Sequence, residues 1–196
     1  MDPGSGAGVA YNPWVRFPGA IAALIGLTGG VASADSERAL SVGLGWATFS
    51  VPGKAVGNME PPSISPDVGG AIALTYEHMI GNDLGLRAEL AGGVFYGGAG
   101  KDQTNTAYAV LGDAGFVFRF DVLKYVPYAF GGIGAVATGG GPIDRGLDFV
   151  LAVGGGLDIL ASRARSYGVE ARLASFGGDV TVFTLGVRGS CRWGYF

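Results

Sequence analysis

A single histidine and a single cysteine limit the chemistry that this chain could perform. His78 and Cys191 are the only residues of their kinds among 196. One cysteine cannot form an intrachain disulfide, and a cysteine-rich metal site is excluded. A serine hydrolase needs a serine, a histidine and an acid brought together, so His78 would have to serve any such site.

Three glycine runs could suggest a loop that cradles phosphate groups. They are Gly131-Gly132, Gly139-Gly140-Gly141 and Gly154-Gly155-Gly156. A phosphate-binding loop leads from a strand into a helix and carries a lysine, and these runs have neither feature. We interpret the glycines as positions where strands curve or approach closely. We therefore predict no catalytic residue, no cofactor and no metal.

The charged residues are the remaining candidates for a polar site, and they follow an alternating pattern. From Val68 to Tyr96 one set of alternate residues is bulky and apolar, whereas the other set is small or charged. Such alternation predicts strands, and the tight turn at residues 81–83 predicts an antiparallel hairpin. Along the whole chain, the small face carries Glu77, Arg87, Glu89, Asp113, Arg119, Asp148, Asp158, Glu170, Arg172, Arg188 and Arg192.

Seven connections divide the chain after residue 35 into eight predicted strands. The phase of the fifth, Tyr125–Ala137, is ambiguous, and we favour an apolar face of Val126, Tyr128, Phe130 and Val136. The other predicted strands lie near residues 40–48, 68–80, 84–96, 107–120, 147–160, 167–174 and 182–195.

The alternation fits either a soluble barrel with its apolar face inward or a membrane barrel with that face toward lipid. The apolar faces lack Asp, Glu, Lys and Arg, whereas the opposite faces are mostly glycine and alanine. Small residues and a few ion pairs suit the narrow interior of an eight-stranded barrel. Long loops at Val51–Pro66, Gly97–Asn105 and Thr138–Gly146 all fall on one side, as in outer-membrane barrels. We predict an all-β, eight-stranded antiparallel up-and-down transmembrane barrel, with a soluble lipocalin-like ligand-binding barrel as an alternative.

Aromatic residues on the predicted lipid face support this interpretation. Several stand near strand ends, where aromatic girdles mark the two membrane interfaces. Net charge is −3 without a basic cluster, so nucleic acid is not an expected partner. The aromatic residues of this face are Trp46, Tyr76, Tyr96, Tyr108, Tyr128, Tyr167, Trp193 and Tyr195.

Residues 1–34 have the layout of a secretory signal peptide, which leaves residues 35–196 as the barrel domain. An apolar core from Ala20 to Leu27 precedes the small residues Ala32 and Ala34, after which the sequence turns polar. The apolar run is short for the ~20 residues of a spanning helix, so we predict cleavage after Ala34. Residues 1–14 are an atypical extension, and translation that starts at Val15 is one hypothesis.

Several segments resemble the small eight-stranded outer-membrane barrels of the OmpA-transmembrane-domain and OmpX type. They are Pro127–Gly134 (PYAFGGIG), the segment Gly154–Asp158, Val169–Arg172 and the terminal Phe196. A signal peptide followed by such a barrel implies location in a Gram-negative outer membrane and contact with its lipid, and we predict a monomer. The resemblance implies that the barrel-assembly machinery reads the terminal residues.

The end of the chain departs from the family pattern. Phe196 is out of phase with the apolar face of its strand, so either a bulge lies near Gly189 or Tyr195 is the last residue in phase. Tyr195 and Phe196 are thus the predicted assembly signal.

The predicted role is structural or surface-interacting, with a salt-bridge network filling the lumen and a possible ligand at the long loops. A narrow channel for small ions or solutes is the alternative, in which the same charges act as a polar relay. Some related barrels act on lipid A with His, Ser and an acid near the outer rim. His78 is predicted at the opposite end, so we predict that the chain is not an enzyme.

Overall fold

The computed structural model describes most of the predicted barrel domain. The chain divides into two units, Met1–Ala34 and Asp35–Phe196. The predicted signal peptide, with Ala32 and Ala34, lies outside the described residues, as do Tyr195 and Phe196. The described residues are 37–52, 63–98, 106–120, 124–140, 146–176 and 180–194.

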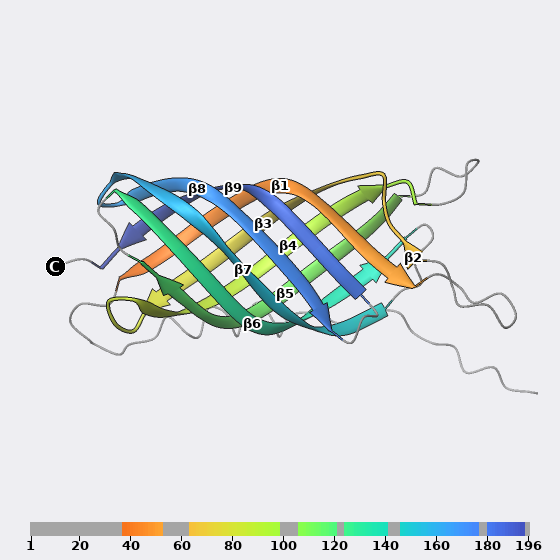
Figure 1. Ribbon diagram of the computed structural model, residues 1–196, viewed down its shortest axis with the longest axis horizontal. Helices are drawn as coiled ribbons and strands as arrows, with labels where there is room; N and C mark the ends of the chain where they lie inside the picture. Colours follow the sequence, from red (N-terminus) through yellow and green to blue (C-terminus); the bar gives the residue numbers. More distant parts are fainter. Residues whose placement is uncertain are drawn as a thin grey trace, which may run out of the picture. The chain divides into compact units, whose positions relative to one another are not determined.

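Eight long antiparallel strands close into a barrel in the described part of the chain (Figure 1). Each long strand pairs with the next along the chain, and β9 also pairs with β1, so every one of them has two neighbours. The predicted eight-stranded antiparallel barrel is confirmed. The strands are β1 (Arg38–Pro52), β3 (Val68–Met79), β4 (Leu84–Tyr96), β5 (Thr106–Arg119), β6 (Tyr125–Gly139), β7 (Gly146–Ser162), β8 (Arg165–Phe176) and β9 (Val180–Trp193).

The predicted hairpin is formed by β3 and β4, which pair without a break from Val68↔Tyr96 to Met79↔Gly85. Residues 80–83 form its turn, in which the Ile80 amide donates to the Leu84 carbonyl at 2.9 Å. The predicted loop Val51–Pro66 is wrong at both ends. β1 continues to Pro52, and a two-residue strand, β2 (Ser63–Ile64), pairs with it there.

The outer face of the barrel is apolar, and the charged side chains of the strands lie mainly inside. Large apolar side chains stand exposed on each long strand, for example Leu44 at 66% and Val187 at 60%, whereas Glu77 and Asp158 are fully buried. The outward aromatic residues include Trp46, Tyr96, Tyr108, Tyr167 and Trp193. No helix among the described residues is long and apolar enough to cross a membrane.

Strand β6 has the opposite phase to the predicted one. Val126, Tyr128, Phe130 and Val136 are buried inside the barrel, and Tyr125 and Ile133 face outward instead. Glycine and alanine fill much of β6, so either face could have been the apolar one. The aromatic rings are inward because they contact charged groups of the lumen, as described below.

Strand β9 excludes one of the two alternatives for the end of the chain. It pairs with both neighbours without interruption through Gly189, so no bulge lies at that residue. A register shift occurs instead between Leu160 and Ser162, beside the turn that joins β7 to β8.

Inward glycines allow the strands to curve around a narrow interior. A Cβ atom built on Gly45 would lie 2.5 Å from the Cα of Gly186, and one on Gly115 would lie 2.3 Å from that of Gly132. Real Cβ atoms are not found at such distances, so alanine would push the paired strands apart at these positions. The interpretation of glycine as a residue of close approach therefore agrees with the geometry.

Candidate functional site in the barrel lumen

The lumen has two parts of different character. Near the short turns, the inward side chains are mainly charged or hydroxylated, and we call this part the charged zone. Toward the opposite end, they are alanine, valine, leucine and phenylalanine, and we call that part the apolar zone. The apolar zone contains Ala47, Phe49, Ala91, Phe95, Ala107, Ala109, Leu111, Val136, Val150, Ala152, Ala174 and Val182.

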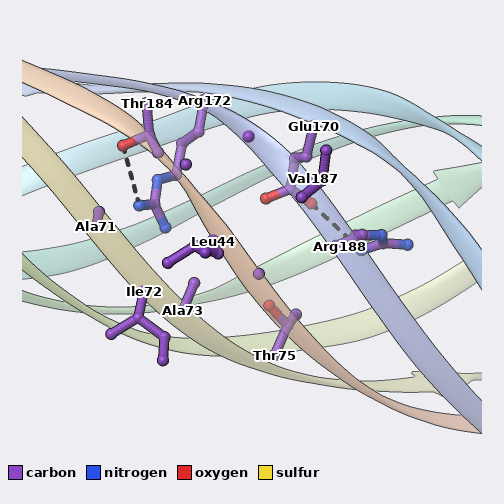
Figure 2. Close-up of a pocket in the computed structure, with 13 residues that line it drawn as sticks. Leu44, Ala71, Ile72, Ala73, Thr75, Glu170, Arg172, Thr184, Val187 and Arg188 are labelled. Atoms are coloured by element: carbon purple, nitrogen blue, oxygen red, sulfur yellow. Dashed lines mark hydrogen bonds and ion pairs between the residues drawn. The ribbon is translucent and has the colours of Figure 1, made fainter.

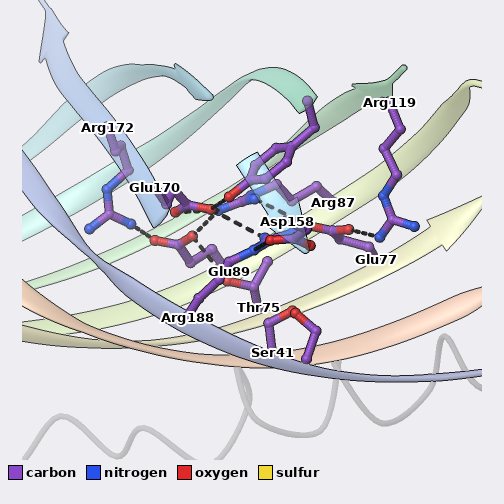
Figure 3. Close-up of polar contacts among 12 residues, drawn as sticks. Ser41, Thr75, Glu77, Arg87, Glu89, Arg119, Asp158, Glu170, Arg172 and Arg188 are labelled. Atoms are coloured by element: carbon purple, nitrogen blue, oxygen red, sulfur yellow. Dashed lines mark hydrogen bonds and ion pairs between the residues drawn. The ribbon is translucent and has the colours of Figure 1, made fainter. Parts of the chain in front are cut away.

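Glu77 is the centre of the charged zone (Figure 3). Its Oε1 accepts hydrogen bonds from Nη1 of Arg87 at 3.2 Å and from Nη1 of Arg188 at 3.1 Å. Its Oε2 accepts from Nη2 of Arg119. These three guanidinium groups come from β4, β9 and β5, so one carboxylate of β3 connects strands on both sides of β3 in the sheet.

Arg87 and Arg188 extend this network across the lumen. Nη2 of Arg87 donates to Glu89 at 2.5 Å and to Glu170 at 2.9 Å. Arg188 forms a bidentate pair with Asp158, at 3.0 Å from Nε and 2.8 Å from Nη2. Paired hydrogen bonds of this kind are among the strongest that a guanidinium makes.

Two aromatic rings of β6 support the same arginines. The guanidinium carbon of Arg87 lies 3.7 Å from the ring centroid of Phe130, and that of Arg188 lies 4.1 Å from the ring of Tyr128. The Tyr128 hydroxyl also donates to Glu170 at 2.9 Å. Cation–π contacts of desolvated arginine are worth about 2 kcal/mol. The alternation predicts both rings on the lipid face, whereas they lie inside the barrel.

The network continues to the turn end of the lumen. Glu37 accepts from Arg119 at 2.7 Å and lies 3.6 Å from Arg192, which also contacts Asp158 at 3.1 Å. Glu37 is absent from the predicted lumen charges. Extending the alternation of the first predicted strand from residue 40 back to residue 37 places it inward with Ala39.

The loop-end edge of the charged zone is formed by Arg172. This arginine pairs with Glu89 and donates to the Thr184 hydroxyl at 3.3 Å. All predicted lumen charges except Asp113 and Asp148 therefore take part in ion pairs.

Asp113 and Asp148 differ from the other lumen charges. Asp113 is 8% exposed, and its Oδ2 is buried without a hydrogen-bond partner among the described residues. Asp148 is half-buried on β7, close to the loop end, and forms no ion pair with any residue that the structure describes. The network leaves both carboxylates outside it.

A small cavity of about 30 Å³ lies between the two zones (Figure 2). Thr75, Glu170, Arg172, Thr184 and Arg188 supply its polar lining. At roughly 10–15 Å³ per water, it has room for about two water molecules. Sites for small molecules are usually of about 300–1,000 Å³, so this cavity suits buried water better than a ligand.

The only histidine and the only cysteine of the sequence lie outside the lumen. His78 pairs across the sheet with Arg38 and Leu86, and Cys191 is exposed on the outer face. Among the residues that the structure describes, no group of three or more His, Cys, Asp or Glu could hold a metal ion.

The comparisons with known proteins show the fold. No protein-family model and no curated protein matches the chain. The structure is similar to Ail, the attachment invasion locus protein of Yersinia pestis, solved in complex with the heparin analogue sucrose octasulfate. That match has 19% identity and a TM-score of 0.54, and covers 81% of this chain and 99% of Ail.

Two further solved structures have the same architecture. Neisserial surface protein A is 14% identical with a TM-score of 0.54, and the match covers 84% of this chain and all of that protein. OprG of Pseudomonas aeruginosa is 11% identical with a TM-score of 0.51, over 78% of this chain and 95% of OprG. The chain has the fold of small outer-membrane barrels, and the predicted resemblance is confirmed at that level.

Proposed function

We propose that this chain is an integral protein of the Gram-negative outer membrane with a structural or surface-interacting role. The observation that carries the proposal is the distribution of side chains, which is the reverse of that in a soluble protein. Large apolar side chains cover the outer face, and the charged network lies inside. Water does not favour such an exterior, whereas the hydrocarbon of a bilayer does. A closed barrel also leaves no strand edge unpaired in lipid.

The orientation follows from the connections. The short turns and both ends of the barrel domain would lie on the periplasmic side, with the long connections outside the cell. Export would use cleavage after Ala34. Recognition of Tyr195 and Phe196 by the barrel-assembly machinery remains part of the proposal, as does the monomeric state.

The side chains that fill the lumen favour a closed barrel over a channel. The charged zone is crossed by ion pairs, and the apolar zone contains an edge-to-face contact of Phe49 and Phe95, with ring centroids 4.8 Å apart. The cavity beside Thr75 and Arg172, at about 30 Å³, is large enough for water alone. We therefore assign the charges a structural role ahead of a relay role.

A partner at the surface would contact the predicted loops Val51–Pro66, Gly97–Asn105 and Thr138–Gly146, most of which lie outside the described residues. The names of Ail, an attachment invasion protein, and of Neisserial surface protein A support a surface role for this fold. The absence of enzymatic activity stays a prediction. It is supported by the place of His78 at the turn end, far along β3 from the long loops.

Gel mobility and conductance test the proposal together. Protein folded in detergent should migrate differently with and without boiling, and planar bilayers containing it should show no discrete conductance steps. A soluble protein with heat-independent mobility would refute the membrane assignment. Discrete steps would replace the closed barrel with the channel.

A substitution on the outer face gives a second test. Leu74 is outward and 43% exposed, so Leu74→Arg places a charge in lipid at a cost of about 2–4 kcal/mol. Ala73→Ser on the inner face of the same strand should be nearly neutral. Equal folding yields of the two variants in lipid vesicles would mean that the outer face does not contact hydrocarbon.

A further inference from the structure

The outer surface has a hollow of about 340 Å³ over strands β1, β3, β4 and β5. Gly92 forms part of its floor, and a Cβ atom added there would meet no atom within 4 Å. The volume is at the lower end of the range of small-molecule sites, and the lining is apolar. The side walls of the hollow are Val42, Ile72, Leu74, Leu90 and Val110.

A basic group lies on the same outer face, toward the turn end. Arg38 has the outward phase of Leu40 and Val42 and pairs across the sheet with His78 on β3 and with Trp193 on β9. Directly opposite residues of paired strands have Cβ atoms about 4.5–5.5 Å apart. Arg38 forms no ion pair with any acid in the described ranges, and Nδ1 of His78 is buried without a hydrogen-bond partner there.

The basic group and the hollow are parts of one continuous surface. Val42, on the wall of the hollow, is four residues along β1 from Arg38, a rise of about 13 Å. Leu74 is likewise four residues from His78 on β3. Leu40 and Tyr76, which pair with each other, join the two features. A cation at one end and an apolar hollow at the other match the two ends of a phospholipid.

We propose that this face binds one anionic phospholipid of the periplasmic leaflet. Its phosphate contacts Arg38 beside His78, and one of its acyl chains occupies the hollow over Gly92. Guanidinium groups bind phosphate by charge-assisted hydrogen bonds, and a tryptophan such as Trp193 is favoured at the headgroup level. The inference rests on the proposed function because it needs the barrel to lie in a membrane with its turns on the periplasmic side.

Two pairs of variants separate this site from general membrane contact. Arg38→Gln removes the proposed phosphate contact, whereas Arg165→Gln removes an outward charge at the same end, on β8, away from the hollow. Gly92→Leu fills the hollow. Gly131→Leu adds the same side chain on β6, where a Cβ atom has ordinary contacts of 3.9 Å and longer.

Native mass spectrometry of the detergent-folded protein, after incubation with equal amounts of phosphatidylglycerol and phosphatidylcholine, measures the binding. The wild type should retain one phosphatidylglycerol in preference to phosphatidylcholine. Arg38→Gln should reduce the retention of phosphatidylglycerol about tenfold, because it removes one charge-assisted hydrogen bond to the phosphate. Gly92→Leu should reduce it by a similar factor, because the acyl chain loses its contacts in the hollow. Arg165→Gln and Gly131→Leu should behave as the wild type does.

Three results would overturn the inference. Unchanged retention in Arg38→Gln and Gly92→Leu would exclude the site, and an equal loss in Arg165→Gln would indicate diffuse charge attraction. Conversion of a dimer to a monomer by Gly92→Leu would show that a second copy occupies the hollow. Heat-dependent gel mobility, measured on the same samples, distinguishes these results from failure of the proposed function, in which the wild type itself would not fold as a barrel.

Discussion

The charged zone and the apolar zone fill the same narrow lumen in different ways. In the charged zone each group depends on named partners, as Glu77 does on Arg87, Arg119 and Arg188. In the apolar zone the side chains are mostly small and interchangeable in kind, with Phe95 and Leu111 among the larger ones. Loss of one ionic partner leaves a buried charge uncompensated, whereas loss of one methyl group leaves only a cavity. The two zones should therefore respond differently to substitution.

The largest effect is expected for Glu77→Gln. The variant keeps the shape of the side chain but removes the negative charge shared by three arginines. Breaking a buried ion pair in this way costs about 3–5 kcal/mol. Urea unfolding of the protein in lipid vesicles, followed by gel mobility, measures the difference. A loss below about 1 kcal/mol would mean that water screens these charges as it does exposed pairs.

A smaller loss is expected for Leu111→Ala in the apolar zone. Leu111 is 4% exposed, and buried Leu→Ala substitutions cost about 2–5 kcal/mol, according to how far the site closes around the cavity. Many neighbours are alanines, so we expect about 2 kcal/mol in the same unfolding assay. Because the members of the apolar zone are uncharged and Leu111 forms no ion pair, high salt should leave this loss unchanged. A salt-dependent loss would show that the charged network extends into this zone.

The hydroxyl pair of Ser41 and Ser190 lies in the charged zone but carries no charge. Substituting it therefore measures the cost of losing a neutral hydrogen bond, without the loss of an ion pair. The two Oγ atoms are 2.8 Å apart and buried. Ser41→Ala should cost about 1 kcal/mol, because it leaves the partner hydroxyl unpaired. Replacing both serines with alanine should be closer to neutral than the single change. A double variant that loses the sum of both single effects would show that the two hydroxyls do not act as a pair.

The sequence predicts which residues of a strand face outward better than it predicts the contacts among the inward side chains. In β3 and β4, period-two alternation places Leu74 and Leu86 outside and Glu77 inside, because a strand has only two faces. In β6 the alternation holds but the predicted phase is wrong, because Tyr128 and Phe130 are apolar by type yet contact arginines of the lumen through their rings.

The ion pairs themselves were beyond prediction. Glu77 and Arg188 are 111 residues apart, and only closure of β9 onto β1 brings them together. Alternation assigns a face to each residue but does not fix the register across the closed barrel. The predicted list of inward charges therefore named most members of the network without naming any of its contacts.

The only expected effect of opposite sign belongs to Asp113→Asn. The lumen network has five arginines, at positions 87, 119, 172, 188 and 192, and five paired acids, at positions 37, 77, 89, 158 and 170. Asp113 adds a further carboxylate, buried beside the apolar zone with Oδ2 unpartnered among the described residues.

Asparagine removes the surplus charge at nearly constant volume, so Asp113→Asn should stabilise the barrel by about 1 kcal/mol in vesicle unfolding at neutral pH. Asp158→Asn is the matched control, because Asp158 forms bonds with Arg188 and Arg192 and its loss should destabilise. Destabilisation by both variants would show that Asp113 also compensates an arginine. Asp113 would then belong to the charged zone, and the boundary between the two zones on β5 would lie between Asp113 and Leu111.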